Sequence, residues 1–279
     1  MGKKRLKRLL VTGAAGGIGK AIRTKLAPLA EIVRLSDRAG VGEAASHEEI
    51  VYCDLTDADS VEKMVAGCDG IVHLGGQSVE ADWQTVRDSN IEGLYNLYEA
   101  ARKHKAGRIF FASSNHVIGY YPQSQLLDAH TPPRPDGLYG VSKAFGEALA
   151  SLYHDKFGIE TAIVRIGSCF PEPVDHRMLA TWLAADDLVS LLECMFEASR
   201  LGCPIIYGMS DNDVVWWDNS QVAYLGWKPK YSSAIFKKII DAKMVRPHKD
   251  KAVSVYQGGV FTEHPIMKKK PDYEKGKGT

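Results

Sequence analysis

The sequence predicts an α/β fold, a doubly wound parallel sheet with a small C-terminal region that caps it. Two observations support this class. Over the first 166 residues, short apolar runs alternate with longer segments in which apolar residues recur at helical spacing. A polar or glycine-containing cluster ends nearly every run. Such alternation is typical of parallel strands joined by helical crossovers, with helices on both faces of the sheet.

The elements of this first part follow one another in a regular order. We expect strands at 8–11, 31–35, 50–53, 70–74, 109–112 and 161–166. A helical pattern follows the glycines after the first strand and runs to Leu29, and further helices are predicted over 60–66, 88–103 and 138–157. Ligands bind beyond the carboxyl ends of parallel strands, so the polar clusters should meet at one edge of the sheet.

The pattern changes after residue 166. A loop at 168–173 precedes a helix that the Asp186–Asp187 pair is expected to cap. A seventh strand at 204–207 and a final helix at 232–244 follow. We therefore divide the chain into a core, a capping region interleaved with the same domain, and a lysine-rich tail expected to be disordered, over residues 1–166, 167–265 and 266–279.

Composition and charge exclude several classes of protein. A formal net charge of +1 argues against a nucleic-acid binder, and the basic start, Lys3–Arg8, is expected to be a solvated leader. The apolar run behind it, Leu9–Val11, is too short for a signal peptide or a membrane span. The five cysteines lack a CxxC motif, and the histidines lack metal-ligand spacing. We expect reduced thiols, no metal and a cytoplasmic location.

A glycine triplet lies between the first strand and the first helix. Gly13, Gly16 and Gly19 permit a tight turn and a close approach of the backbone to a pyrophosphate. Asp37, at the end of the next strand, stands where an acidic residue binds the adenosine ribose. This context favours a Rossmann-type dinucleotide site over a simple strand-to-helix turn. Asp37 favours NAD over NADP, although Arg38 could accommodate a 2′-phosphate.

Asp54 and Leu55 end the third strand, at the same edge of the sheet. Their position suits contacts with the adenine ring. The alternative role for Asp54 is to cap the helix that follows it.

A tyrosine and a lysine four residues apart carry the predicted chemistry. Tyr139 and Lys143 lie on one face of the helix over 138–157. A nearby ammonium stabilises a phenolate, so Tyr139 could take a proton from an alcohol well below its free pKa of about 10. Ser113 and Ser114 end the fifth strand at the same sheet edge. An exposed helical pair without a role is the alternative, and it leaves this convergence unexplained.

These motifs resemble those of the short-chain dehydrogenase/reductase superfamily, in its NAD-dependent epimerase/dehydratase-like branch. The glycine and Tyr-x-x-x-Lys motifs carry the resemblance together with the runs 90–100 and 113–119, and it covers residues 8 to about 240. It implies an enzyme in which Ser114 is the catalytic serine, Tyr139 the base and Lys143 its partner, with Ser113 competing for the serine role. It also implies a homo-oligomer and NAD as cofactor. The implied cofactor contacts are Gly13, Gly16, Ile18, Gly19, Asp37, Asp54, Leu55, Leu74, Gly75, Asn90, Ser113, Tyr139, Lys143, Ile166 and Cys169.

A narrower resemblance links the chain to the bacterial uronate dehydrogenases. It rests on the runs 73–76, 113–122, 165–169 and 216–219. That family oxidises free glucuronate or galacturonate with NAD at the anomeric carbon, giving the aldarolactone. The resemblance implies substrate contacts from Ser78, Ser114, Asn115, His116, Tyr139, Ser168 and Arg177.

Arg177 has a physical reason to bind this substrate. A uronate carries a carboxylate, and arginine presents a planar fork that binds a carboxylate bidentately. The alternative for Arg177 is a surface ion pair. The alternative for His116 is a structural role, since Tyr139 already supplies a base. Gln77 stands where the resembled family has an aliphatic residue, so it either alters the preference between the two epimers or faces solvent.

Two other functions stay open. A nucleotide-sugar epimerase or dehydratase usually has a larger region after the sixth strand, and the run 165–169 differs from the Asn-Tyr-Gly-Pro-type pattern of those enzymes. A non-catalytic NAD-binding regulator would not need Tyr139, Lys143 and the upstream serine together. Turnover of a UDP-sugar would support the first function, and NAD binding without substrate-dependent reduction would support the second.

Overall fold

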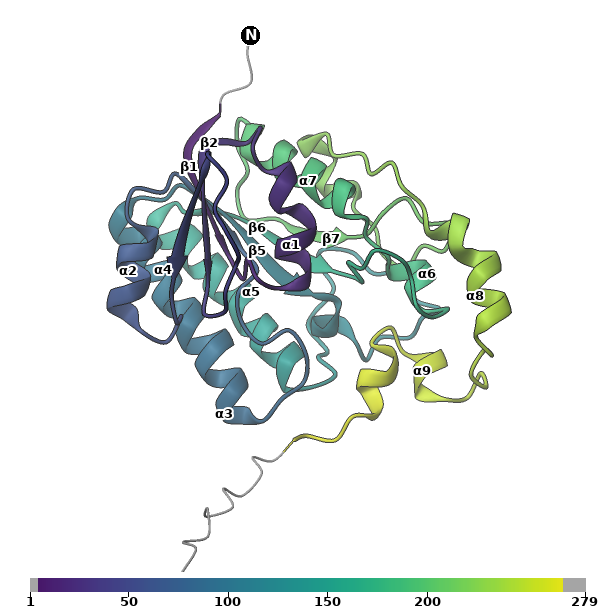
Figure 1. Ribbon diagram of the computed structural model, residues 1–279. Coiled ribbons are helices and arrows are strands. Elements are labelled where there is room, and N and C mark those ends of the chain that lie inside the picture. Colours follow the sequence, from purple (N-terminus) through teal and green to yellow (C-terminus); the bar gives the residue numbers. More distant parts are fainter. Residues whose placement is uncertain (1–4, 268–279) are drawn as a thin grey trace, which may run out of the picture.

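The computed structural model describes residues 5–267, which form a seven-stranded sheet flanked by helices (Figure 1). Neighbouring strands are all parallel, in the order β3-β2-β1-β4-β5-β6-β7. The order reverses between β1 and β4, which is where doubly wound sheets bind their ligands. The predicted fold class is therefore confirmed. The strands are β1 (Leu6–Thr12), β2 (Ala30–Asp37), β3 (Glu48–Tyr52), β4 (Gly70–His73), β5 (Arg108–Ser114), β6 (Glu160–Ile166) and β7 (Ile205–Gly208).

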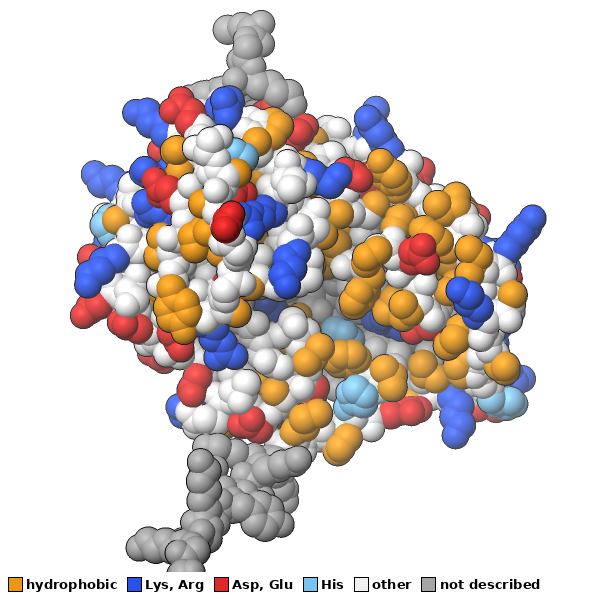
Figure 2. Space-filling model, in the orientation of Figure 1, with side chains coloured by type: hydrophobic (Ala, Val, Ile, Leu, Met, Phe, Trp, Pro, Cys, Tyr) orange, Lys and Arg blue, Asp and Glu red, His pale blue; other side chains and the backbone are white. Residues whose placement is uncertain are grey.

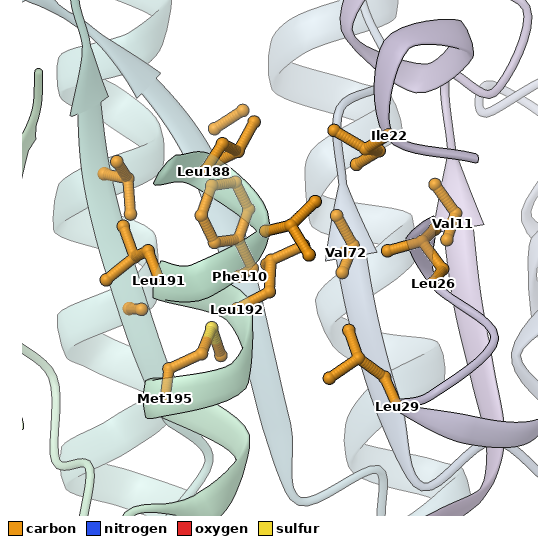
Figure 3. Close-up of a cluster of buried hydrophobic side chains, with 14 of the residues drawn as sticks. Val11, Ile22, Leu26, Leu29, Val72, Phe110, Leu188, Leu191, Leu192 and Met195 are labelled. Carbon is orange, nitrogen blue, oxygen red and sulfur yellow. The ribbon is translucent and has the colours of Figure 1, made fainter. Parts of the chain in front are cut away.

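Two layers of helices bury both faces of the sheet. On one face lie α1 (Gly17–Ile22) and α7 (Ala185–Glu197), and on the other lie α2 (Ala58–Val65), α4 (Gly93–His104) and α5 (Leu138–Phe157). Burial on both faces explains why the strands are nearly continuous apolar runs. Figure 3 shows the first of these layers, where side chains from α1, α7 and the sheet meet: Val11, Ile22, Leu26, Leu29, Val72, Phe110, Leu188, Leu191, Leu192 and Met195.

Some predicted helices differ from the observed ones. The helix predicted to continue to Leu29 ends at Ile22, followed by a 3-10 turn over Arg23–Lys25. Pro28 disfavours helical geometry at the residue before it, so a helix could not continue to Leu29. The helix predicted over 88–103 consists of a π-helical turn over Arg87–Glu92 and α4, and a short helix that was not predicted, α3 (Trp83–Val86), precedes it. The long helix predicted over 138–157 coincides with α5.

The C-terminal part completes the sheet and adds short elements. These are α6 (Met178–Thr181), 3-10 turns over Ser220–Leu225, Ser233–Phe236 and Gly259–Glu263, α8 (Lys237–Lys243) and α9 (Ala252–Val255). The predicted capping of α7 by Asp186 and Asp187 is wrong, because both lie in its first turn and Ala184 is the N-cap residue. Asp187 instead accepts backbone N–H groups from Lys230 and Tyr231. From residue 268 onward, the predicted tail lies outside the described residues.

Several general properties bear on function. All five cysteines are free thiols. Within residues 5–267, no helix is both long and apolar enough to cross a membrane. In the same part of the chain, no group of three or more His, Cys, Asp or Glu side chains is arranged to hold a metal ion.

Candidate active site

The turn between β1 and α1 requires glycine. Gly13 has a φ of +71°, and a Cβ there would lie 2.7 Å from the backbone of Leu74 and Gly75. A Cβ on Gly19 would lie 2.5 Å from the carbonyl oxygen of Gly13. The turn thus packs directly on the end of β4, at the point where the strand order reverses. Its shape fits a loop that a pyrophosphate approaches closely.

Asp37 reaches back to this turn from the end of β2. Its Oδ2 accepts the N–H of Ala15 at 3.0 Å, and its Oδ1 accepts the N–H of Ala39 at 2.9 Å. Each carboxylate oxygen keeps a further lone pair for a ribose hydroxyl. Arg38 beside it is exposed. The arrangement keeps a negative charge where a 2′-phosphate would otherwise lie.

Asp54 does not cap the next helix. Its Oδ1 accepts hydrogen bonds from the backbone N–H and the hydroxyl of Thr56, whereas Asp57 is the N-cap residue of α2. The capping alternative for Asp54 is therefore wrong. The Leu55 side chain packs near Gly75 and Gly93, next to the end of β4. Both residues lie at the expected edge of the sheet.

Tyr139 and Lys143 are buried side by side on α5. The Lys143 Nζ donates to the carbonyl oxygen of Ala112 at 2.8 Å and lies 5.7 Å from the centre of the Tyr139 ring. The Ser114 side chain lies near enough to the Tyr139 phenol to lower its pKa. The structure therefore brings the predicted serine, tyrosine and lysine together at the end of β5.

The pKa values of the two groups differ from the simple expectation. Burial raises the pKa of Tyr139 to about 12, against the neighbouring Ser114 side chain, which lowers it. Burial also lowers the pKa of Lys143 to about 8. The expected lowering of the tyrosine pKa by the ammonium is therefore not observed, because loss of hydration is the largest influence on both groups. At pH 7 Lys143 still keeps its proton.

A second group of polar side chains faces the same edge from the capping region. Arg177 donates from Nε to the backbone oxygen of Gln257 at 2.6 Å. When the Asn115 amide is oriented to satisfy its neighbours, its oxygen accepts from the Arg177 guanidinium and its nitrogen donates to the Ile166 oxygen at 3.2 Å. Burial lowers the pKa of Arg177. Among residues 5–267 the guanidinium has no salt-bridge partner, so the predicted alternative of a surface ion pair is wrong.

His116 is fixed between these two groups. Its Nδ1 lies 2.8 Å from Asp136 Oδ2, and its ring stacks on Phe261 with the ring centres 3.9 Å apart. The ring also meets Tyr139 edge to face, at 5.8 Å between centres. Burial lowers the pKa of His116 more than Asp136 raises it. The imidazole therefore has a structural partner and still borders the tyrosine.

The molecular surface is hollowed where these side chains meet. Figure 2 shows a depression beyond the carboxyl ends of the strands, with basic and histidine side chains in its floor and apolar ones along its rim. Ser168, after β6, is buried and shares a hydrogen bond of 2.8 Å with the Thr181 hydroxyl. Ser78, after β4, is exposed. A small polar ligand can thus meet groups from several loops.

Comparisons with known proteins agree with this geometry. A family model described as NAD dependent epimerase/dehydratase family matches residues 9–185. The uronate dehydrogenase of Agrobacterium fabrum (strain C58) is 57% identical over 263 residues, which are 94% of this chain and 99% of that protein. The chain belongs to the NAD-dependent epimerase/dehydratase family. Within this family it groups with the uronate dehydrogenases.

Solved structures of this group have the same fold. Glucuronic acid dehydrogenase from Chromohalobacter salexigens superposes with a TM-score of 0.93 at 54% identity, covering 94% of this chain and 98% of that chain. A tyrosine-to-alanine variant of uronate dehydrogenase from Agrobacterium tumefaciens, complexed with NAD, gives a TM-score of 0.92 at 57% identity, covering 94% and 99%.

Not all predicted site residues of this family member lie together. Tyr139, Lys143, Ser114, His116 and Asn115 form one cluster with Arg177, and the glycine turn with Asp37 lies across the end of β4. Cys169, partly buried, follows β6, and burial raises the pKa of its thiol to about 12. The Gln77 backbone is fixed by the amide of Asn90 through bonds of 2.7 and 3.0 Å. That amide is therefore already occupied within the chain.

Four residues near the site were not predicted. Glu80 binds the start of α5, Asp136 holds His116, Gln257 holds Arg177, and Phe261 stacks on His116. Each acts on a partner far along the chain, and none belongs to a motif. Asp136 stands just before the glycine at the start of α5, and Glu80 follows soon after a strand. Many acidic residues have such positions, so the sequence gives only a weak signal for these two.

Proposed function

We propose that this protein oxidises a free uronic acid, D-glucuronate or D-galacturonate, at its anomeric carbon with NAD, giving the aldarolactone. The observation that carries the substrate class is Arg177, a half-buried guanidinium that contacts Asn115 and forms no salt bridge among residues 5–267, with Asp136 and Asp175 as the carboxylates that act on its charge. Partial burial of a cation that forms no salt bridge is costly, and a bound carboxylate would lower that cost. The names of the similar enzymes support the same substrate class.

The cofactor would be held by the edge formed from β1, β2 and β4. Gly13, Gly16 and Gly19 leave room for a pyrophosphate, and Asp37 would accept hydrogen bonds from the adenosine ribose. Asp54, Leu55, Leu74 and Gly75 border the adjoining surface. Bound NAD⁺ supplies the two-electron acceptor that takes the hydride from the anomeric carbon.

The chain supplies the proton chemistry. Tyr139, as phenolate, takes the proton of the anomeric hydroxyl, while Ser114, whose side chain neighbours the phenol, would orient the reacting oxygen. The Lys143 ammonium lies 5.7 Å from the centre of the Tyr139 ring and is fixed there by its bond to Ala112, so it would stabilise the phenolate once that forms. Proton transfer of this kind contributes about 10²–10⁴-fold to rate.

The substrate carboxylate would bind the remaining guanidinium N–H groups of Arg177. Asn115 and Gln257 hold this guanidinium from two sides, so that its fork is pre-oriented. Ser78, His116 and Ser168 would contact sugar hydroxyls. Arg177 and Ser168 both belong to residues 167–265, which supports the division into a cofactor-binding core and a capping region. A homo-oligomer remains a prediction that size-exclusion chromatography with light scattering would test.

One assay tests the function and its rivals. NADH absorbance is followed after mixing protein and NAD⁺ with glucuronate, galacturonate, a neutral hexose or UDP-glucuronate. We expect rapid reduction with a free uronate only, and a loss of at least about 10²-fold in Tyr139→Phe with NAD binding retained. Turnover restricted to the UDP-sugar, or unchanged turnover in Tyr139→Phe, would contradict the proposal.

A further inference from the structure

Glu80 is a buried carboxylate, 6% exposed, in the loop after β4. Its Oε1 accepts the N–H of Leu138 at 3.0 Å, and its Oε2 accepts the N–H of Tyr139 at 2.9 Å. These are the first two residues of α5, and the N-cap residue, Gly137, has no side chain to cap them. Because the first N–H groups of a helix lack partners within it, a carboxylate from another loop satisfies two of them and meets the positive end of the helix dipole.

Gly137 leaves space for this carboxylate. A Cβ on Gly137 would lie 2.3 Å from Glu80 Oε2 and 2.9 Å from its carboxyl carbon. The backbone of Gly137 is extended, with φ −172°, which any residue can adopt. The glycine is therefore required by the carboxylate and not by the backbone conformation.

A second contact joins the same loop to α5. Asn90, from the π-helical turn, binds both backbone polar groups of Gln77 and donates to the Ser142 hydroxyl at 2.9 Å. Ser142 in turn donates to the backbone oxygen of Tyr139 at 2.7 Å. The loop 77–80, which carries Ser78, is thus tied to the first turn of α5 at both of its ends.

We propose that Glu80 is a positioning residue that fixes Tyr139 against the loop carrying Ser78. The proposal rests on the function above, in which Tyr139 is the base and Ser78 contacts the sugar. The carboxylate bonds to the backbone N–H of Tyr139 itself, so a change at Glu80 moves the start of the helix that carries the phenol. A misplacement of about 1 Å at a reacting group can cost about 10²-fold in rate.

Glu80→Gln tests the carboxylate. The amide keeps the size of the side chain but replaces one acceptor oxygen with an NH₂ group, which faces a backbone N–H. We expect kcat with the uronate to fall about 10- to 100-fold, while the uronate KM and the NAD Kd stay near wild type. The NAD Kd is measured by calorimetry on the whole protein.

Glu160→Gln is the matched control. Glu160 also accepts two backbone N–H groups, from Leu201 at 2.7 Å and Gly202 at 2.8 Å, but it begins β6, at the edge of the sheet opposite the site. We expect Glu160→Gln to lower the Tm and leave kcat unchanged. A kcat loss in Glu160→Gln equal to that in Glu80→Gln would show a general effect of stability and overturn the proposal.

Gly137→Ala reaches the same contact from the other side. The variant leaves Glu80 and Tyr139 unchanged, but its Cβ would displace the Glu80 carboxylate from the helix start. We therefore expect the same loss of kcat. If Glu80→Gln does not fold, this variant decides. Unchanged kcat in folded Gly137→Ala, with Tyr139→Phe inactive, would overturn the positioning role alone. A wild-type protein without uronate turnover would instead overturn the proposed function.

Discussion

Ser113 and Ser114 are neighbours on β5, yet their hydroxyls have different partners. The Ser113 hydroxyl donates to Glu147 Oε1 at 2.6 Å, within a buried group in which Glu147 also pairs with Arg165 at 2.8 Å. The Ser114 hydroxyl accepts the N–H of His116 at 3.2 Å and lies near enough to Tyr139 to lower the pKa of its phenol. One serine therefore supports the buried Glu147–Arg165 pair, and the other borders the reacting tyrosine.

We therefore expect the two alanine variants to differ in kind. Ser114→Ala should lower kcat by about 10²-fold, as does the loss of one hydrogen-bond donor near a reacting oxygen, with little change in Tm. Ser113→Ala should cost about 1 kcal/mol of stability and leave kcat near wild type, because its bond is structural. Steady-state kinetics and thermal unfolding of both proteins check this. An equal loss of kcat in the two variants would contradict it.

Arg177 should control substrate charge. Replacing Arg177 with alanine removes charged hydrogen bonds worth about 1.5–3 kcal/mol, so kcat/KM for a uronate should fall about 10- to 100-fold or more. The slow rate with a neutral hexose should change little, since that sugar has no carboxylate. Arg134→Ala is the control, because Arg134 is an exposed arginine that lies over the Tyr121 ring. Equal losses for charged and neutral sugars would remove Arg177 from this role.

Residues whose roles depend on local pattern could be predicted, and those whose roles depend on distant partners could not. Apolar periodicity located all seven strands, and Gly158 in the left-handed conformation ends α5 where the pattern stops. The glycine turn, Asp37 and the Tyr139–Lys143 spacing were visible because each motif is contiguous or nearly so.

The misses have a common physical cause. Glu80 bonds to residues 58 and 59 positions away, and Gln257 to a guanidinium 80 positions away. A contact between residues so far apart in the chain leaves no recognisable pattern in a single sequence. The raised pKa of Tyr139 was also missed, because a nearby charge can be inferred from helical spacing whereas the extent of burial cannot.

Asp37 should set the choice of cofactor. Its carboxylate accepts from Ala15 and would repel a 2′-phosphate. Asp37→Ser removes the charge, keeps a small acceptor and leaves Arg38 nearby, so the ratio of kcat/KM with NAD to that with NADP should fall about 10- to 100-fold. Asp57→Ser is the control, since serine also caps helices and Asp57 lies at the start of α2. An unchanged ratio in Asp37→Ser would contradict the assignment.

Lys143 should lower the stability of the fold at neutral pH. Burial lowers its pKa from 10.5 to about 8, so the folded protein disfavours the charged ammonium. The cost is complete below pH 8, shrinks as the pH rises toward 10.5 and is absent above that, and a shift of this size corresponds to about 3 kcal/mol. Lys143→Met removes the charge but leaves the Ala112 carbonyl without its hydrogen bond, worth about 1 kcal/mol.

Lys143→Met should therefore be about 2 kcal/mol more stable than the wild type at pH 7, and inactive. Urea unfolding at pH 7 and pH 10 measures this, and the difference between the two proteins should shrink at pH 10, where the wild-type lysine is neutral in the folded state. Lys63→Met, at an exposed position on α2, should stay within about 0.5 kcal/mol of the wild type at both pH values. A less stable Lys143→Met at pH 7, or a difference that grows with pH, would mean that the buried ammonium has a counter-charge. A more stable, inactive variant would show that the reaction requires a charge that the fold alone does not favour.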